Sequence, residues 1–152
     1  MLCRIERGSC AFRHLIGNLD PGVLFHLHKP PPYDTEDMLM HPAMLLPLTR
    51  LKEMVETDWG GEVKLMITAA YDSLLEHDLA QADDSRKYSQ HFEGRSLDLV
   101  TYPADRSRYA RLCALAHCAG FDFAQNEGDH CHVSIKAASL CTICSGSNGQ
   151  AP

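Results

Sequence analysis

Two short stretches of this sequence carry the residue types that bind a catalytic metal. The first, His91-Phe-Glu-Gly-Arg-Ser-Leu-Asp98, holds an imidazole and a carboxylate, and the second, Asp129-His130-Cys131-His132, holds two further imidazoles beside an acid. His91, Asp98 and His132 are the right types for three corners of a tetrahedral zinc site, whose fourth corner is left for water or a substrate oxygen. We therefore predict a zinc centre with one open position.

An open zinc position is used for hydrolysis when an acid and a hydrogen-bond donor stand beside it. The metal acidifies its bound water, a carboxylate takes the proton, and the donor stabilises the developing oxyanion. Asp129, three residues before His132, and Glu127, five residues before it, are both candidates for the base. His130, when protonated, is the natural oxyanion donor. A lone His-x-His pattern is weak evidence, and the combination with an acid and the earlier His-x6-Asp spacing is much stronger.

The predicted secondary structure brings these side chains to one place. Residues 96–102 alternate like a strand that carries Asp98, and residues 131–136 form another strand. Successive side chains of a strand point to opposite faces, so residues 130 and 132 share one face. Cys131 faces the other way, as a core residue or a disulfide partner. A loop that contains Gly94 delivers His91.

The remaining pattern predicts the scaffold. One helix runs from Pro47 to a stop at residues 59–61, a second runs from about Asp105 to Ala119 with Gly120 as its stop, and the buried strand 62–71 lies between them. Residues 72–90 form an acidic loop, residues 121–124 a short strand and residues 125–129 a turn. The sequence thus predicts a small α+β domain, with a mixed or antiparallel sheet packed against helices.

Length and composition limit the classes of function. The 152 residues suit one domain, and a net charge of −6 argues against a nucleic-acid binder. Arg106, Arg108 and Arg111 form a small cluster, for which a solvated helix face is favoured over a polyanion site. No stretch approaches the ~20 apolar residues of a membrane span, and no signal peptide is visible. We expect an extracellular protein whose sequence is part of a longer secreted chain; an intracellular protein is the alternative.

Seven cysteines are many for a chain of this size. The pairs near the two ends, Cys3 with Cys10 and Cys141 with Cys144, favour disulfides that staple the termini in an oxidising compartment. Half of a zinc ribbon at Cys141 and Cys144, or free thiols, are the alternatives. The odd count leaves at least one cysteine outside any intrachain pair.

Three segments follow from the pattern. Residues 1–42 are an N-terminal extension that is hard to interpret, in which His26 and His28 are predicted to lie at an exposed polar edge. Residues 43–140 form the zinc-binding domain, and residues 141–152 are a linker-like tail.

The first metal motif resembles a known family. His91-Phe-Glu-Gly-Arg-Ser-Leu-Asp98 looks like the His-Tyr-Glu-Gly-Arg-Ala-Val-Asp motif of Hedgehog signalling domains. The resemblance covers roughly residues 47–138 and includes Asp105-Arg-Ser-Arg-Tyr109 and His130-Cys-His-Val-Ser-Ile-Lys-Ala137. The same zinc core is shared by bacterial D-Ala-D-Ala carboxypeptidases, whose Ser-x-His-x6-Asp pattern is matched from Ser89 onward.

The resemblance implies that His91, Asp98 and His132 bind zinc, with His130 beside the open position. Asp129 stands where the peptidases place their base and is our first choice. Glu127 is one residue out of register with the glutamate of Hedgehog domains. A calcium site gains little support, because Ala69 and Ala70 follow Thr68 in the region where Hedgehog domains carry an acid; Asp72 is the one acid retained nearby.

Three functions are compatible with these observations. The favoured one is an extracellular zinc-binding domain that binds a protein or peptide partner through a peptidase-like cleft. The alternative is an active zinc metallopeptidase of carboxypeptidase or dipeptidase type. The third is a structural module whose histidines and acids are ordinary satisfied polar residues. Neither the partner nor the oligomeric state follows from the sequence.

Overall fold

The computed structural model describes residues 5, 7–17, 20–27, 31, 34–71 and 94–136. Several predictions concern residues outside these ranges. They are the zinc ligand His91, Ser89, His28, the loop 72–90, the tail 141–152 and the cysteines Cys3, Cys141 and Cys144.

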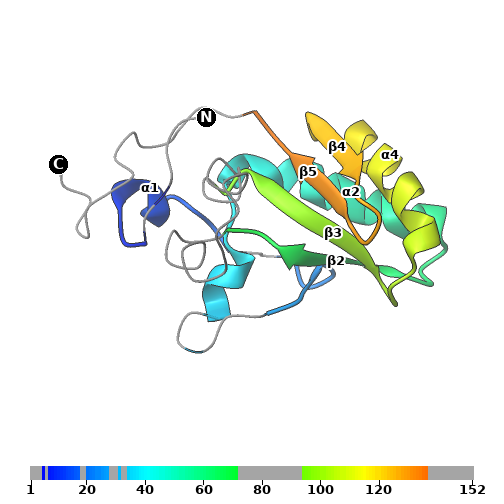
Figure 1. The fold of residues 1–152 in the computed structure, drawn as a ribbon, viewed down its shortest axis with the longest axis horizontal. Helices are drawn as coiled ribbons and strands as arrows, with labels where there is room; N and C mark the ends of the chain where they lie inside the picture. The colour runs from blue at the N-terminus through cyan, green and yellow to red at the C-terminus, as the bar shows by residue number, and fades with distance from the viewer. Residues whose placement is uncertain are drawn as a thin grey trace.

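A five-stranded mixed sheet forms the centre of the described structure, in the order β1-β2-β3-β5-β4 (Figure 1). The two-residue strand β1 (Leu24–Phe25) runs parallel to β2 (Lys64–Ala69), and all other neighbours are antiparallel. The others are β3 (Ser96–Tyr102), β4 (Phe123–Asn126) and β5 (Cys131–Ser134). Together with the helices, this sheet confirms the predicted α+β class.

Two helices, α2 (Leu45–Asp58) and α4 (Tyr109–Ala119), pack on one face of the sheet (Figure 1). α2 follows a 3-10 turn, η2 (Pro42–Met44), whose entry is capped by the His41 imidazole accepting from the Ala43 amide at 3.0 Å. α4 ends at Gly120, which takes the left-handed φ of 118° that favours glycine. A capping residue therefore marks the entry to α2, and a glycine marks the end of α4. The apolar face of each helix is the face that packs against the sheet.

The core lies between these helices and the sheet. β3 shows why: Leu97 and Leu99 are fully buried toward the helices, whereas Asp98 between them is only half-buried on the opposite face. The helices contribute buried residues such as Leu51 and Leu112 to the same cluster. One face of the sheet is therefore covered by helices, and the other carries the polar side chains of the predicted site.

Residues before position 43 also contribute to this core. β1 joins the edge of the sheet, and Val23 and Met40 belong to the main hydrophobic cluster. A second, smaller cluster of Ile5, Ala11, Leu15 and Tyr71 lies beside it. Two shorter elements, α1 (Cys10–Arg13) and η1 (Asp34–Met38), belong to the same region. His26, just after β1, is exposed as predicted.

Several predicted boundaries shift by about two residues: the helix predicted from Pro47 begins at Leu45, the strand predicted at residues 62–71 spans Lys64–Ala69, and the strand predicted at residues 131–136 spans Cys131–Ser134. The second helix begins as a 3-10 turn, η5 (Arg106–Arg108), capped by Asp105, and becomes α-helical at Tyr109. The strand predicted at residues 121–124 lies at residues 123–126, because Phe121 is buried in the core between helix and strand. Within the described residues, no helix is both long and apolar enough to span a membrane.

Candidate metal centre

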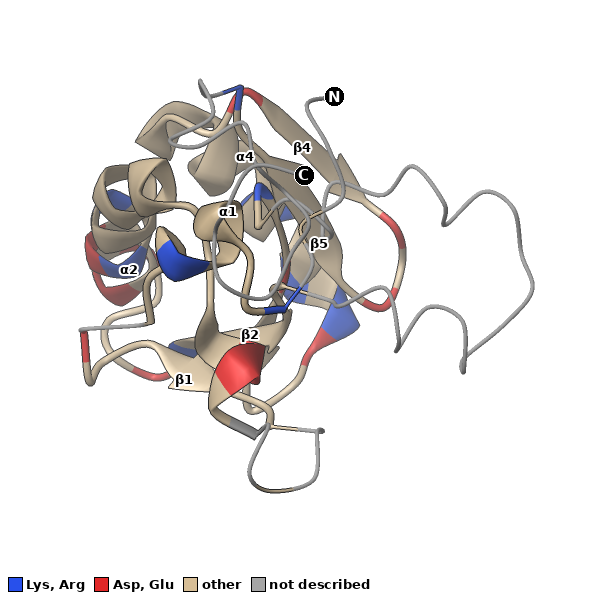
Figure 2. Cartoon of the chain, turned by 90° about the vertical axis from the view of Figure 1, so that its left-hand side faces the viewer, with Lys and Arg blue, Asp and Glu red and all other residues tan. Residues whose placement is uncertain are grey.

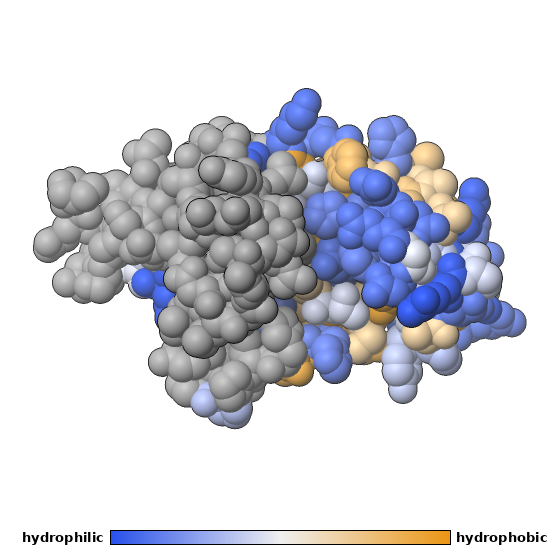
Figure 3. All heavy atoms as spheres, in the orientation of Figure 1, coloured by the Kyte–Doolittle hydropathy of each residue, from blue (hydrophilic) through white to orange (hydrophobic). Residues whose placement is uncertain are grey.

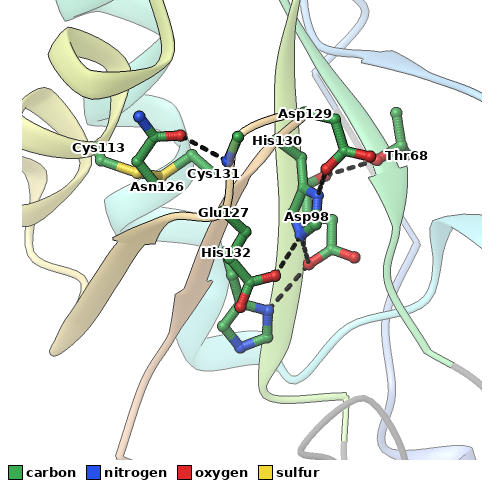
Figure 4. Close-up of polar contacts among 10 residues, drawn as sticks. Thr68, Asp98, Cys113, Asn126, Glu127, Asp129, His130, Cys131 and His132 are labelled. Carbon is green, nitrogen blue, oxygen red and sulfur yellow. Dashed lines mark hydrogen bonds and ion pairs between the residues drawn. A yellow bond between two sulfur atoms is a disulfide. The ribbon is translucent and has the colours of Figure 1, made fainter. Parts of the chain in front are cut away.

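Three potential metal ligands converge on the open face of the sheet (Figure 4). They are Asp98 from β3, His132 from β5 and His130 immediately before β5. One ligand atom from each residue lies within 4.8 Å of the others. Each side chain is about one-fifth exposed, so the group is half-buried and remains open to solvent on one side.

Strand register places the carboxylate beside the imidazole. In the antiparallel pair β3–β5, Asp98 is directly opposite His132, and their Oδ1 and Nδ1 atoms lie 2.9 Å apart. Strand alternation turns His132 to the open face and Cys131 to the helix face, where Cys131 is fully buried and forms a disulfide with Cys113 of α4. The prediction that Cys131 is a core residue or disulfide partner is confirmed.

His130 is surrounded by acids. Its Nε2 lies 2.7 Å from Glu127 Oε2 and 3.5 Å from Asp98 Oδ1, and its Nδ1 lies 2.6 Å from Asp129 Oδ1. The tight turn between β4 and β5 brings Glu127 and Asp129 close to the His130 ring. In this turn the Glu127 amide donates to the His130 carbonyl at 3.0 Å, and Gly128 takes a left-handed φ of 97°. Both predicted candidates for a base therefore contact the predicted oxyanion donor.

This environment favours the protonated imidazole. Burial alone would lower the pKa of His130, but the negative charge of Asp98 and the hydrogen bond to Asp129, with the charge of Glu127, outweigh burial and raise that pKa. The hydrogen bond from His130 in turn lowers the pKa of Asp129. A protonated imidazole donates from both nitrogens and has no lone pair for a metal. Glu127 contacts Nε2 of His130 and Asp129 contacts Nδ1, so either role, ligand or donor at the open position, requires one of these contacts to open.

The donor set fits a zinc ion. Asp98 Oδ1 and His132 Nδ1 are hydrogen-bonded at 2.9 Å. To bind one zinc ion together they would separate by about 0.5 Å, because ligand atoms ~2.0–2.1 Å from a tetrahedral zinc are about 3.4 Å apart. A carboxylate and an imidazole are both ordinary zinc ligands. The predicted third ligand, His91, lies outside the described residues, and His130 is the other imidazole within reach. The complete ligand set therefore stays a prediction.

Two contributors to the site were not predicted. The Phe123 ring of β4 packs edge-on against the His132 ring, with centroids 6.2 Å apart, and is 47% exposed. Cys113 reaches the site through its disulfide with Cys131. Helical spacing gave a signal for Cys113, since it lies four residues after Tyr109 and three before Ala116, on the buried side of α4. No sequence pattern indicated that Phe123 lies at the site, because its position beside His132 depends on the register between β4 and β5.

Two of the three arginines in the predicted cluster, Arg108 and Arg111, contact neighbouring acids. Arg111 forms two hydrogen bonds with Asp58, and Arg108 lies over the Trp59 ring and near Asp105. Lys and Arg lie beside Asp and Glu along the described chain rather than in one basic stripe (Figure 2). These contacts support the solvated helix face over a polyanion site.

Gly94 shapes the backbone that leads from the first metal motif into β3. Its φ is +70°, its carbonyl accepts from the His41 amide at 2.8 Å, and a Cβ there would lie 2.7 Å from Leu15 Cδ2. We expect Gly94→Ala to lower the free energy of unfolding by about 1–3 kcal/mol, because a left-handed conformation and a steric clash add together. Urea unfolding measures this. Gly17→Ala is the control, since nothing lies within 4 Å of its Cβ position; equal effects would contradict the argument.

Comparison with known proteins identifies the family. A model of the Hedgehog amino-terminal signalling domain matches residues 1–134. The chain belongs to this family. It is 34% identical over 144 residues to Tiggy-winkle hedgehog protein of Danio rerio, covering 94% of this chain and 32% of that protein. Sonic hedgehog protein of Xenopus laevis is also 34% identical, with 94% of this chain and 30% of that protein covered.

The similarity extends to insects. Protein hedgehog of Drosophila virilis is 30% identical over 140 residues, which cover 89% of this chain and 26% of that protein. The chain thus spans about a third or less of the length of these Hedgehog relatives. Asp98, His130 and His132 all lie inside the segment that the Hedgehog signalling-domain model matches.

Proposed function

We propose that this Hedgehog-family domain is an extracellular signalling module that binds zinc and uses the zinc cleft to bind a protein or peptide partner. The observation that carries the proposal is the pair formed by Asp98 and His132. Their ligand atoms are 2.9 Å apart on the open face of the sheet, with His130 beside them. Membership of a signalling-domain family supports the signalling and extracellular parts of the proposal.

Each residue has a distinct role in this proposal. Asp98 and His132 hold the metal together with an imidazole from His91. The bound ion would supply positive charge and a coordination position for a carbonyl or carboxylate oxygen of the partner. His130, whose Nε2 contacts Glu127 and whose Nδ1 contacts Asp129, would place positive charge beside the same group, and would donate to it from Nε2 once the Glu127 carboxylate turned away.

The open face also offers apolar contact area. Phe123 and Tyr102 are 47% and 56% exposed, and Tyr102 lies four residues from Asp98 in β3, on the same face of the strand. Exposed aromatic rings provide much of the binding energy at protein interfaces. Figure 3 shows hydrophobic patches among hydrophilic residues on the described part of this side of the molecule. A metal centre beside the exposed Phe123 ring, with Tyr102 further along β3, suits a folded or extended polypeptide better than a small polar ligand.

The metallopeptidase alternative is supported less well. A base must be free to take a proton from metal-bound water, whereas the carboxylates of Glu127 and Asp129 both contact His130. Side-chain rotation in either acid would be needed before it faced the open position. We therefore favour partner binding over hydrolysis.

Elemental analysis combined with a hydrolysis screen tests the proposal. The purified domain should contain one equivalent of zinc, and a chelator should lower its thermal stability. At a free zinc concentration of 1,000 times the dissociation constant, binding adds about 4 kcal/mol to the stability. We expect no turnover of D-Ala-D-Ala peptides or of a peptide library. Chelator-sensitive hydrolysis would favour the peptidase, and absence of zinc would favour the structural module.

A further inference from the structure

We propose that the Cys113–Cys131 disulfide positions the two histidines of the metal centre and thereby sets the affinity of that centre for zinc. The inference rests on the proposed zinc site. It concerns Cys113 and Cys131 as positioning residues, which touch neither the metal nor a partner.

The cross-link is attached to the strand between the two histidines. Cys131 is the residue that separates His130 from His132, and its side chain points to the helix face while theirs point to the open face. The bond joins it to Cys113, with the two Cα atoms 5.7 Å apart. Figure 4 shows the disulfide on one side of β5 and the polar cluster on the other.

The turn that carries His130 has little packing of its own. Residues 125–129 are all exposed and His130 is half-buried, so Cys131 is the first fully buried position after the turn. Its cross-strand neighbours are Leu99 in β3 and Asn126 in β4. The covalent bond to α4 therefore fixes the point at which an exposed hairpin enters the core.

The packing of α4 limits how far Cys131 can move, because the disulfide joins Cys131 to this helix. Cys113 lies on the buried face of the helix, next to the fully buried Leu112, and is itself 7% exposed. A helix packed across the sheet moves as a unit, so the disulfide holds β5 against a rigid element. Metal ligands need to stay within ~0.5 Å of their productive positions. When a residue that holds a metal ligand in position is lost, the affinity for the metal typically falls by 10–100-fold.

A variant that keeps the packing but lacks the bond tests the inference. Cys113→Ala combined with Cys131→Val leaves apolar side chains in the buried space, and circular dichroism checks its fold. We expect zinc to bind at least about 10-fold more weakly than to the wild type, as measured by competition with a chromophoric chelator. Cys118→Ala is the matched control, because Cys118 is an exposed free thiol on the same helix. It should bind zinc like the wild type. A folded double variant with zinc affinity within about twofold of the wild type would overturn the proposal.

Nuclear magnetic resonance of the wild-type protein gives a second test that needs no variant to fold. With the disulfide intact, the ring contact between Phe123 and His132 should already be present without metal and should persist after zinc is added. A contact that forms only when zinc binds would show that the metal, and not the cross-link, orders the site. A wild type that binds no zinc refutes the proposed function instead, while the ring contact still reports whether the cross-link positions His132.

Discussion

Replacing His132 with alanine is expected to lower the zinc affinity of the domain by more than about 100-fold, because a lost ligand costs more than the 10–100-fold of a lost outer partner. The imidazole supplies one of the two metal-binding groups that the structure places side by side, and its Nδ1 is 2.9 Å from Asp98 Oδ1. Elemental analysis after dialysis should find zinc in the wild type and almost none in the variant. The increase in melting temperature that zinc gives to the wild type should disappear as well.

A matched histidine separates this effect from a general loss of weak metal binding. His26 is exposed just after β1, which pairs with β2 and carries none of the three clustered residues, so His26→Ala should retain full zinc content. Asp98→Asn gives a second variant, in which the shape of the side chain is kept and its charge is lost. Zinc retained at one equivalent in both His132→Ala and Asp98→Asn would remove these residues from the ligand set.

Strand periodicity explains why part of the site could be predicted from the sequence. Alternation in residues 96–102 gave the bounds of β3 and the side on which Asp98 lies. The same rule put His130 and His132 on one face and Cys131 on the other. Both predictions need only the two-residue repeat of a strand, which is a local property.

What could not be predicted depends on contacts between distant segments. Local sequence patterns do not reveal the strand register that sets Asp98 opposite His132. The two strands are separated along the chain by a helix and a further strand, so their alignment depends on tertiary packing. Strand β1 is two residues long and pairs in parallel, so it has no periodicity to detect. The number of cysteines alone does not say whether Cys113 or Cys118 pairs with Cys131. Burial on the helix separates them, since Cys113 is buried in a disulfide and Cys118 is an exposed free thiol.

Leu99→Ala should produce the largest loss of stability among single substitutions near the site, about 2–5 kcal/mol in the free energy of unfolding. Leu99 is fully buried in β3, with Ile67 and Cys131 as its cross-strand neighbours, so truncation leaves a cavity that the flanking strands cannot easily close. Urea unfolding of the metal-free protein measures the change. Leu46→Ala is the matched control, because Leu46 is 58% exposed and its loss should change stability by no more than about 0.5 kcal/mol.

The same variant distinguishes a folding effect from a ligand effect. Leu99 points toward the helices and Asp98 toward the open face, so the truncation removes core packing and leaves both metal-binding groups in place. Saturating zinc should therefore add the same stabilisation to Leu99→Ala as to the wild type, whereas it should add almost none to His132→Ala. A Leu99→Ala protein that is folded but no longer gains stability from zinc would mean that the core face of β3 and the metal face are coupled through the strand. In that case the site would depend on the whole sheet rather than on the local register of β3 and β5.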